Sequence, residues 1–450
     1  MPDFSPQLLL PILQHYPNVR RYWVAFSGGV DSSVLLHAMA QLAPELQSSQ
    51  LNAIYIDHGL QAESQQWSDH CLSVCEKLGI NIISLSAEVR LGQGDSLEEK
   101  ARESRYLLLA DFIDEGDALL TAQHKDDQAE TFLLQALRGA GPKGLASMAM
   151  AKSFSKGLHL RPLLGFSKQN LISYAKDNNL TWVEDPSNAQ MRFQRNYLRQ
   201  KVFPVVRKTW PSMSDALSRS AEHCAANIGL LNQLADIDME AVTNTDNTLS
   251  RVALNSLLPD RRANLLRYWL SEKNLRVPDQ VRLEQIIHQL ATSAADKSPM
   301  VSWSGAEVRC YRDKVYAMPP LVPVDNKRVF KWQPSEKLEF DGGVLSARQV
   351  KGAGLRIPEE SEIEVRFRQG GERCQPAGQA QSRELKTLFQ EWAVPHWLRD
   401  RIPLIYVNGK LVAIADFTVC QPYIVSGAGM GWQFDWQSDC RSGWQWSSKR

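Results

Sequence analysis

The sequence predicts an α/β fold: a doubly wound parallel sheet, followed by a mostly helical domain and a small α+β C-terminal domain. Over residues 1–210, short apolar runs with strand character alternate with stretches that carry apolar side chains at helical spacing, which is typical of a parallel sheet covered on both faces. Helical spacing dominates residues 211–318, whereas residues 324–450 contain period-two alternation and a hairpin turn. We therefore expect three domains with these boundaries, joined in the last case by a proline-rich linker.

The composition is that of an ordinary globular protein. Of the 450 residues, 43% are apolar and 22% are charged, and the formal net charge is +1, so a nucleic-acid surface would have to come from local clusters of cations. The chain has no apolar run long enough to span a membrane. Its seven cysteines are scattered and odd in number, as in proteins of a reducing cytosol. We expect a cytoplasmic protein without a membrane partner, and the sequence leaves open whether it forms a homodimer.

The first domain is expected to bring its turns to one edge of the sheet. Strands are predicted at residues 22–26, 51–56, 80–85 and 117–121, and helices at residues 33–43, 64–78, 96–113 and 126–137. Ligands on such sheets bind beyond the carboxyl ends of the strands. Three turns fall at those ends, namely the loop from Ser27, the turn at Asp57 and the turn that ends at His124. Their convergence predicts a binding site.

A glycine-containing loop connects the first strand to the first helix. The loop consists of Ser27, Gly28, Gly29, Val30, Asp31 and Ser32. Adjacent glycines allow a sharp turn and a close approach to a ligand, and the N–H groups of a helix N-terminus favour an anion. Asp31 fits this setting if a Mg²⁺ ion bridges its carboxylate to phosphate oxygens. A tight turn with a capping Ser or Asp is the simpler alternative, and the spacing excludes a Walker A loop and a dinucleotide fingerprint.

The helix after the fourth predicted strand opens with acidic residues. Asp127 and Glu130 are three positions apart and share a helix face. Two carboxylates aimed at one cleft can hold Mg²⁺ or the ammonium group of an amine substrate, although acids in a first turn also complement the helix dipole. His124 precedes this turn, and Lys143 lies in a glycine-rich loop that is able to shape a substrate pocket.

Two further stretches carry cations. Arg102 belongs to a charged stripe on the helix at 96–113, where it either faces solvent or reaches a triphosphate or an RNA. Residues 191–210 contain no acid and combine basic with aromatic side chains, a pattern that suits phosphate neutralisation and base stacking and equally suits the edge of a long amphipathic helix. The residues concerned are Arg192, Arg195, Arg199, Lys201, Arg207, Lys208, Phe193, Tyr197 and Phe203.

The rest of the chain yields shorter signals. Helices are predicted at residues 211–240, 259–271 and 278–290, and strands at residues 300–303 and 307–316. Near the C-terminus, residues 363–367 alternate with period two, and the dipeptide at 408–409 predicts a two-residue hairpin turn. A helix is expected from Ser382 to just before Pro395, and Trp432, Phe434 and Trp436 are expected on one face of a strand.

The set of motifs resembles that of the tRNA(Ile)-lysidine synthetases. The glycine loop alone is similar to the pyrophosphate-binding loop of the PP-loop (adenine nucleotide alpha hydrolase-like) ATP pyrophosphatases. The other matching segments follow in the family's order: His58-Gly59-Leu60, Ala101-Arg102, Arg105-Tyr106, His124 to Thr131, Arg138-Gly139, Arg161-Pro162-Leu163-Leu164, Asp185-Pro186-Ser187-Asn188, Arg195-Asn196 and Arg199. Residues 368–417 also resemble the family's C-terminal domain, which implies contact with the body of the tRNA.

The resemblance implies a ligase that uses ATP and Mg²⁺ and has isoleucine tRNA and free L-lysine as partners. The carbonyl oxygen of the wobble cytidine of the CAU anticodon would attack the α-phosphorus and release pyrophosphate, and lysine would then displace AMP to give lysidine. An amide-like oxygen leaves readily only after adenylation, and backbone N–H groups together with Mg²⁺ would stabilise the departing pyrophosphate.

The expected roles divide into four groups. ATP binding is assigned to Ser27, Gly28, Gly29, Val30, Asp31, Ser32, His58 and Gly59, with Asp31 also serving Mg²⁺. The catalytic residues are Asp31, Arg102, Asp127 and Glu130, and the lysine pocket comprises His124, Asp127, Glu130 and Lys143. The tRNA contacts are Arg195, Arg199, Lys201, Arg207, Lys208, Arg373, Arg383, Lys386 and Arg399.

Two other functions compete with this interpretation. A tRNA thiolase can use the same loop, but it needs a nucleophilic or cluster-binding cysteine near the cleft, and the chain has no Cys-x-x-Cys. A non-catalytic ATP-binding or RNA-binding module would bind ATP without cleaving it and would have little use for the paired Asp127 and Glu130.

Overall fold

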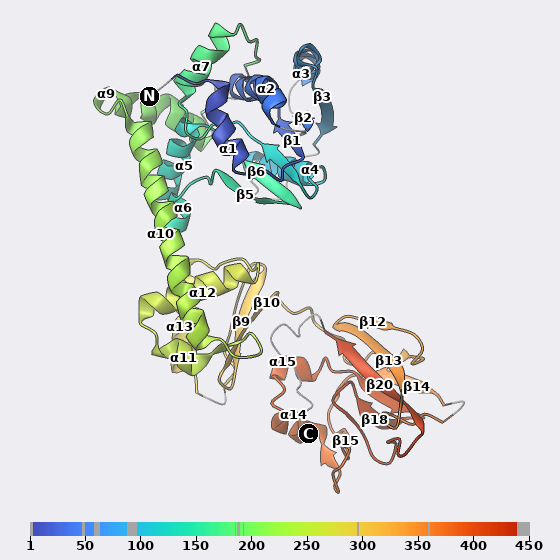
Figure 1. Cartoon of the computed structure of the whole chain (residues 1–450). Helices are drawn as coiled ribbons and strands as arrows, with labels where there is room; N and C mark the ends of the chain where they lie inside the picture. The colour runs from blue at the N-terminus through green and yellow to red at the C-terminus, as the bar shows by residue number, and fades with distance from the viewer. Residues whose placement is uncertain are drawn as a thin grey trace. The chain divides into compact units, whose positions relative to one another are not determined.

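The structure is a computed structural model that describes residues 3–46, 50–57, 64–87, 97–184, 186, 190–191, 193–294, 297–358 and 361–438. Its chain contacts divide into two compact units, Met1–Leu230 and Leu231–Arg450 (Figure 1). This division gives two units and does not test the three domains expected from the sequence, which remain a prediction. The predicted ATP-binding residues His58 and Gly59 lie outside the described residues, as do Asp185, Ser187, Asn188 and Arg192.

The first unit is organised by a six-stranded sheet with the strand order β3-β2-β1-β4-β6-β5. Its strands are β1 (Arg21–Ala25), β2 (Gln50–Asp57), β3 (Asn81–Ser86), β4 (Asp117–Leu120), β5 (Ala151–Phe154) and β6 (Gly157–Leu160). All neighbouring pairs are parallel except β5 with β6. The parallel sheet was predicted, whereas the short β5–β6 hairpin was missed because four-residue strands carry too little alternation to be recognised.

Helices cover both faces of this sheet because the side chains of its strands alternate. From β1, Tyr22 and Val24 join a cluster with α2 (Val30–Leu42), α3 (Ser64–Leu78) and α7 (Lys168–Asp177), whereas Trp23 joins a second cluster with α4 (Leu97–Ala110). Cys71 and Cys75 are buried in the first cluster. This layered arrangement leaves the strand ends as the place where polar loops meet.

The remaining helices of the first unit bring the basic segment against the acidic helix. They are 3₁₀ helices at Pro6–Leu9 and Ala43–Glu45, α1 (Leu10–Gln14), α5 (Lys125–Leu137), α6 (Pro142–Leu145), α8 (Gln194–Tyr197), a π-helix at Leu198–Val202, α9 (Phe203–Thr209) and the long α10 (Met213–Val242). Ala129 of α5 packs with Leu198, Phe203 and Met213. The basic segment is therefore an amphipathic helical stretch whose apolar side holds it against α5.

The middle of the chain contributes helices and a small sheet. The helices are α11 (Arg251–Ser256), α12 (Pro259–Glu272) and α13 (Gln280–Thr292), and the sheet has the order β7-β10-β9-β8, with β7 (Leu249–Ser250), β8 (Met300–Trp303), β9 (Ala306–Tyr311) and β10 (Lys314–Met318). The predicted strand at 307–316 is split into β9 and β10. Arg312 lies in the turn between them and has a positive φ of 55°. Arginine is not a typical residue for this conformation, so the turn was not predicted from the sequence.

In its described residues, the C-terminal part combines several small sheets with two short helices. The sheets are β11-β14-β17-β18-β19, β12-β13-β20 and β15-β16, with β11 (Phe330–Lys331), β12 (Leu338–Phe340), β13 (Gly343–Lys351), β14 (Ile363–Arg366), β15 (Arg373–Cys374), β16 (Arg383–Glu384), β17 (Leu404–Val407), β18 (Lys410–Ile414), β19 (Thr418–Val419) and β20 (Met430–Gln437). The helices are α14 (Leu385–Glu391) and α15 (His396–Arg399). The predicted helix from Ser382 is thus shorter than expected.

Two local predictions for this part are confirmed. Asn408 and Gly409 have φ values of 50° and 76°, as a two-residue turn between β17 and β18 requires. Trp432, Phe434 and Trp436 alternate with exposed residues along β20, so they point to the same side of the strand. In the described part of the chain, no helix has both the length and the apolar composition needed to cross a membrane.

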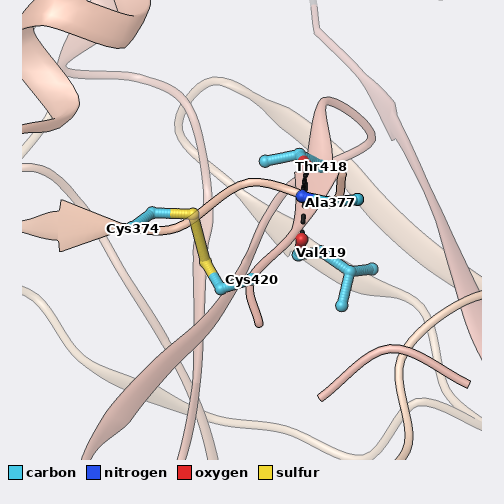
Figure 2. Close-up of a disulfide and its surroundings, with 5 residues drawn as sticks. All are labelled: Cys374, Ala377, Thr418, Val419 and Cys420. Atoms are coloured by element: carbon cyan, nitrogen blue, oxygen red, sulfur yellow. Dashed lines mark hydrogen bonds between the residues drawn. A yellow bond between two sulfur atoms is a disulfide. The ribbon is translucent and has the colours of Figure 1, made fainter. Parts of the chain in front are cut away.

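A disulfide joins Cys374 of β15 to Cys420, just after β19 (Figure 2). Next to it, the backbone N–H of Ala377 donates hydrogen bonds to the carbonyl of Val419 and the hydroxyl of Thr418, at 3.1 and 3.3 Å. The scattered cysteines led us to expect free thiols, and this pair differs from that expectation because folding brings together two residues that are 46 positions apart.

Candidate functional site

The site lies at the carboxyl edge of the parallel strands. Ser27 follows β1, Thr121 follows β4 and Arg161 follows β6, and these strands run in the same direction. The predicted loop from Ser27 and the predicted turn that ends at His124 therefore begin at one edge of the sheet. Asp57, the last residue of β2, belongs to the same edge.

The glycine loop forms a tight connection whose geometry requires glycine at one position. Gly28 has a positive φ of 75°, and a Cβ atom there would lie 3.1 Å from the sulfur of Cys71. Its carbonyl accepts a hydrogen bond from the N–H of Val183 at 2.9 Å. The hydroxyl of Ser32 donates to the carbonyl of Gly29 at 2.9 Å and lies 3.1 Å from the hydroxyl of Ser27. The loop is thus held in shape by its own hydroxyl groups and by the neighbouring segment.

The helix that follows begins earlier than predicted. Gly29 is the N-cap residue of α2, so Val30, Asp31 and Ser32 form its first turn rather than part of the loop. Ser27 is exposed and Val30 is half-buried, which leaves this helix N-terminus accessible to an anion.

Asp31 is engaged by a lysine that the sequence analysis missed. The ammonium of Lys168 lies 2.7 Å from both carboxylate oxygens of Asp31, and Nε2 of His124 lies 3.7 Å from one of them. Lys168 opens α7, more than a hundred positions away, and no motif in the sequence relates the two residues. Among the described residues, no group of three or more His, Cys, Asp and Glu side chains is arranged to hold a metal ion.

Asp127 and Glu130 share one cation. Arg199 donates to the two oxygens of Glu130 at 2.8 and 3.0 Å and to Asp127 at 3.3 Å. The side chain of Glu130 is only 1% exposed, and its burial raises the pKa of its carboxyl group, against the opposing effect of Arg199. Burial opposes the charge on Arg199, but Glu130 and Asp127 outweigh it and raise the pKa of the guanidinium. The two carboxylates thus share the guanidinium of Arg199, a residue that was predicted to contact tRNA, at the place where Mg²⁺ or a substrate ammonium was predicted.

The first turn of α5 is fixed by its own cap and by neighbouring helices. The backbone N–H of His124 donates to the carboxylate of Asp127 at 3.0 Å, closing a capping box. Asp126 accepts from the backbone N–H of Lys168 at 2.8 Å and from the hydroxyl of Ser214 at 2.7 Å. It also pairs with Arg207. These bonds join the acidic turn to α7, α9 and α10. The acidic side chains therefore have specific partners, in addition to any favourable interaction with the helix dipole.

The other predicted residues of the first unit are placed as follows. Arg102 of α4 is exposed and lies over the ring of Tyr106, 5.2 Å from its centroid. The glycine-rich loop contains the short helix α6, and Lys143 is an exposed residue of this helix. Arg195 donates to the hydroxyl of Thr131 at 3.1 Å. Lys201 and Lys208 are exposed on the basic segment.

The predicted tRNA contacts of the C-terminal part differ in how they are paired. Arg373 lies 3.7 Å from Glu384, and Arg383 lies 2.6 Å from Glu391. Lys386 is exposed.

Arg399 departs from the prediction of a phosphate contact. It is only 6% exposed and donates to the carbonyl of Val394 at 2.9 Å and to the hydroxyl of Tyr311 at 3.0 Å. Its guanidinium is thus enclosed by this part of the protein, and its position in the sequence gave no sign of that burial.

Comparison with protein-family models gives three matches along the chain. Residues 7–206 match a PP-loop domain, residues 249–316 match the TilS substrate binding domain, and residues 363–436 match the TilS substrate C-terminal domain. The first match contains the whole sheet edge described above.

Comparison with curated proteins gives relatives over almost the whole length. A tRNA(Ile)-lysidine synthase of Coxiella burnetii is 40% identical over 437 residues, covering 96% of this chain and 97% of the relative. One of Methylococcus capsulatus is 41% identical over 87% of this chain and 90% of the relative. Among solved structures, a U34-tRNA thiolase NcsA from Methanococcus maripaludis is 17% identical over 48% of this chain and 77% of that chain, with a TM-score of 0.41, which is too weak a likeness to support a conclusion.

Proposed function

The chain belongs to the tRNA(Ile)-lysidine synthase family, and from that premise we propose how its sheet edge carries out lysidine formation on tRNA(Ile). It is a ligase that uses ATP through its PP-loop domain. The finer assignment is that free L-lysine is joined through its ε-amino group to the wobble cytidine. The observation that supports it most directly is the pair of carboxylates, Asp127 and Glu130, which already holds one guanidinium at this edge.

The first step needs the outer phosphates of ATP to be held while the α-phosphorus stays open. The N–H groups at the start of α2, beside the exposed Ser27, suit the β- and γ-phosphates because they offer hydrogen-bond donors and the positive end of a helix dipole. The carbonyl oxygen of cytosine attacks the α-phosphorus, the bond to the bridging oxygen breaks, and pyrophosphate leaves. Fixed donors stabilise its charge without the reorganisation that water would require.

The second step needs lysine to be oriented beside the activated base. A lysine ammonium group can bind where the guanidinium of Arg199 now lies, since both cations donate charge-assisted hydrogen bonds to carboxylates. After the ammonium group has lost a proton to solvent, the lysine amine attacks the ring carbon and forms a C–N bond, the C–O bond to the adenylate breaks, and AMP leaves with the oxygen. The carboxylate pair contributes by fixing the substrate, because holding reactants in place removes part of the entropic barrier.

Asp31 is the residue of the proposed site that fits Mg²⁺. Asp31 offers a carboxylate at the start of α2, next to the expected phosphates, and Mg²⁺ in nucleotide sites commonly takes one or two carboxylates together with phosphate oxygens and water. Asp31 would hold the ion after exchanging its contact with Lys168, and the ion would supply charge neutralisation at the leaving pyrophosphate.

The buried cysteines argue against a thiolase. Burial raises the pKa of Cys71 to about 12 and that of Cys75 to about 11, so these thiols near the glycine loop are poor nucleophiles. The family relationship likewise favours ligation rather than sulfur transfer.

The decisive experiment is mass analysis of tRNA nucleosides after incubation with ATP and isotopically labelled lysine. We expect a labelled lysidine nucleoside and the release of pyrophosphate that depends on unmodified tRNA(Ile). Pyrophosphate release with any RNA, or with none, would contradict the assignment, and sulfur in the product would favour the thiolase.

A further inference from the structure

A group of cations surrounds Tyr106 of α4, next to the β5–β6 hairpin. Arg102 lies 5.2 Å from the centre of the Tyr106 ring, and the ammonium of Lys152 lies 5.9 Å from it. Arg161, which follows β6, interacts with the side chain of Tyr106 as well. We call Arg102, Lys152 and Arg161 the Tyr106 cluster.

The strand register places the cluster at the carboxyl edge. Lys152 of β5 is paired with His159 of β6, and Tyr106 of α4 contacts the rings of Phe154 and His159 at 5.8 and 5.7 Å. Because Lys152, Phe154 and His159 share one face of the hairpin, the cluster lies on the side of the sheet that α4 covers.

The cluster is not neutralised by the acids around it. Among the residues that the structure describes, no ion pair involves Arg102, Lys152 or Arg161. Burial and the charges of Arg161 and Arg102 lower the pKa of Lys152, which is the sign of cations that repel one another. Beneath them, burial and the same cations lower the pKa of His159 to about 3. Positive charges that are gathered without a counterion are suited to an anionic ligand.

We propose that the Tyr106 cluster, in which Lys152 and Arg102 are exposed and Arg161 is buried, binds a backbone phosphodiester of the RNA substrate next to the reacting nucleotide. This proposal depends on the proposed function and adds to it a contact that positions the RNA. The phosphates of ATP are the other source of the same chemistry. Neighbouring strands lie about 4.8 Å apart, so β5, three strands from β1, lies roughly 14 Å from the glycine loop. That separation favours RNA over the outer phosphates of ATP.

The test compares the Lys152→Ala variant with the wild-type enzyme. We expect tRNA(Ile) to bind about fivefold more weakly, and the slope of log affinity against log salt to shrink by about 0.7–0.9, as for one lost phosphate contact. The KM for ATP should not change. Lys152→Arg should restore the affinity, because it keeps the charge, and a thermal melt confirms that each variant folds.

Lys156 provides the matched control. It is exposed, lies at the turn of the same hairpin and is paired with Asp114 at 3.2 Å, so Lys156→Ala should leave tRNA affinity and the salt slope unchanged. Unchanged tRNA affinity in Lys152→Ala, or a higher KM for ATP without weaker tRNA binding, would overturn the proposal. If the wild-type enzyme makes no lysidine while Lys152→Ala still weakens RNA binding, the proposed function fails and the RNA contact stands.

Discussion

The Tyr106 cluster and the C-terminal residues 363–436 both contain several basic side chains, but they differ in whether those side chains are paired with carboxylates. In the C-terminal residues, many arginines have a carboxylate within 4 Å, in the pairs Arg366–Glu364, Arg368–Asp400, Arg373–Glu384 and Arg383–Glu391. In the Tyr106 cluster, no described carboxylate forms such a pair. A count of basic residues therefore overestimates the charge that the C-terminal residues offer to a polyanion.

The difference matters because pairing changes what a surface cation can do. An exposed ion pair contributes only about 0–1 kcal/mol to stability, yet a phosphate must compete with the carboxylate already in place. Unpaired cations carry no such cost, so their affinity for a phosphate is larger and more sensitive to salt. Four substitutions test this contrast and the assignments made above.

The largest effect is expected for Glu130→Gln, which removes a buried carboxylate without changing its shape. Since charged hydrogen bonds contribute about 1.5–3 kcal/mol each, we expect kcat/KM for lysine to fall by roughly 100-fold, while tRNA affinity stays within about twofold. Lysidine formation at varied lysine concentrations measures the first quantity, and filter binding measures the second.

Glu384→Gln is the matched control for that variant, because Glu384 lies in an exposed pair of the C-terminal residues, 3.7 Å from Arg373. It should keep near-normal turnover. Normal turnover in Glu130→Gln would remove the carboxylate pair from the active site and would make the two regions equivalent in this respect.

Gly28→Ala should come next. A left-handed φ costs a side-chain residue roughly 1–2 kcal/mol, and the new Cβ would also press on Cys71, so we expect the KM for ATP to rise by about tenfold or more. Gly79→Ala shares the positive φ, at 67°, but has nothing within 4 Å of the added Cβ. A similar KM for ATP in the two variants would show that the loop's shape does not serve ATP.

Arg399→Ala should act on folding rather than on RNA. Removing a buried guanidinium leaves the carbonyl of Val394 and the hydroxyl of Tyr311 without their donor, which costs about 2–3 kcal/mol of unfolding free energy. We expect a lower denaturation midpoint with an unchanged salt slope of tRNA binding. Lys386→Ala, an exposed counterpart, should show the reverse, with unchanged stability and up to a few-fold weaker binding. An Arg399 variant of normal stability that binds tRNA poorly would restore the original assignment.

The smallest effect concerns the pH dependence of stability. His159 has a folded pKa of about 3, below the unfolded value of about 6.5, so its contribution is complete above pH 6.5 and is lost as the pH falls toward 3. Between pH 7 and pH 6, we expect the free energy of unfolding to decrease by about 0.7 kcal/mol through this group. Denaturant titrations at several pH values should show that stability depends less on pH in His159→Asn, and an equal dependence in both proteins would mean that the pKa of His159 is not lowered by folding.

The sequence alone predicted the parallel sheet, the glycine turn between a strand and a helix, and the placement of Asp127 and Glu130 on one face of a helix, because each depends on residues that are close in the chain. It did not predict Lys168 on Asp31, nor Arg199 on Glu130, because such pairs form only when distant helices meet. The burial of Arg399 was not predicted either, since the sequence pattern does not distinguish an arginine that is buried with hydrogen-bond partners from one on the surface. The β5–β6 hairpin escaped detection for its shortness, and with it Lys152.

The bond between Cys374 and Cys420 has a practical consequence for anyone who handles this enzyme. Samples prepared with and without a reductant are two chemical species that differ by two hydrogen atoms, although they have the same sequence. Because cross-linking restricts the unfolded chain, their melting temperatures should not coincide. Comparisons of tRNA affinity between such samples are meaningful only after the free thiols have been counted.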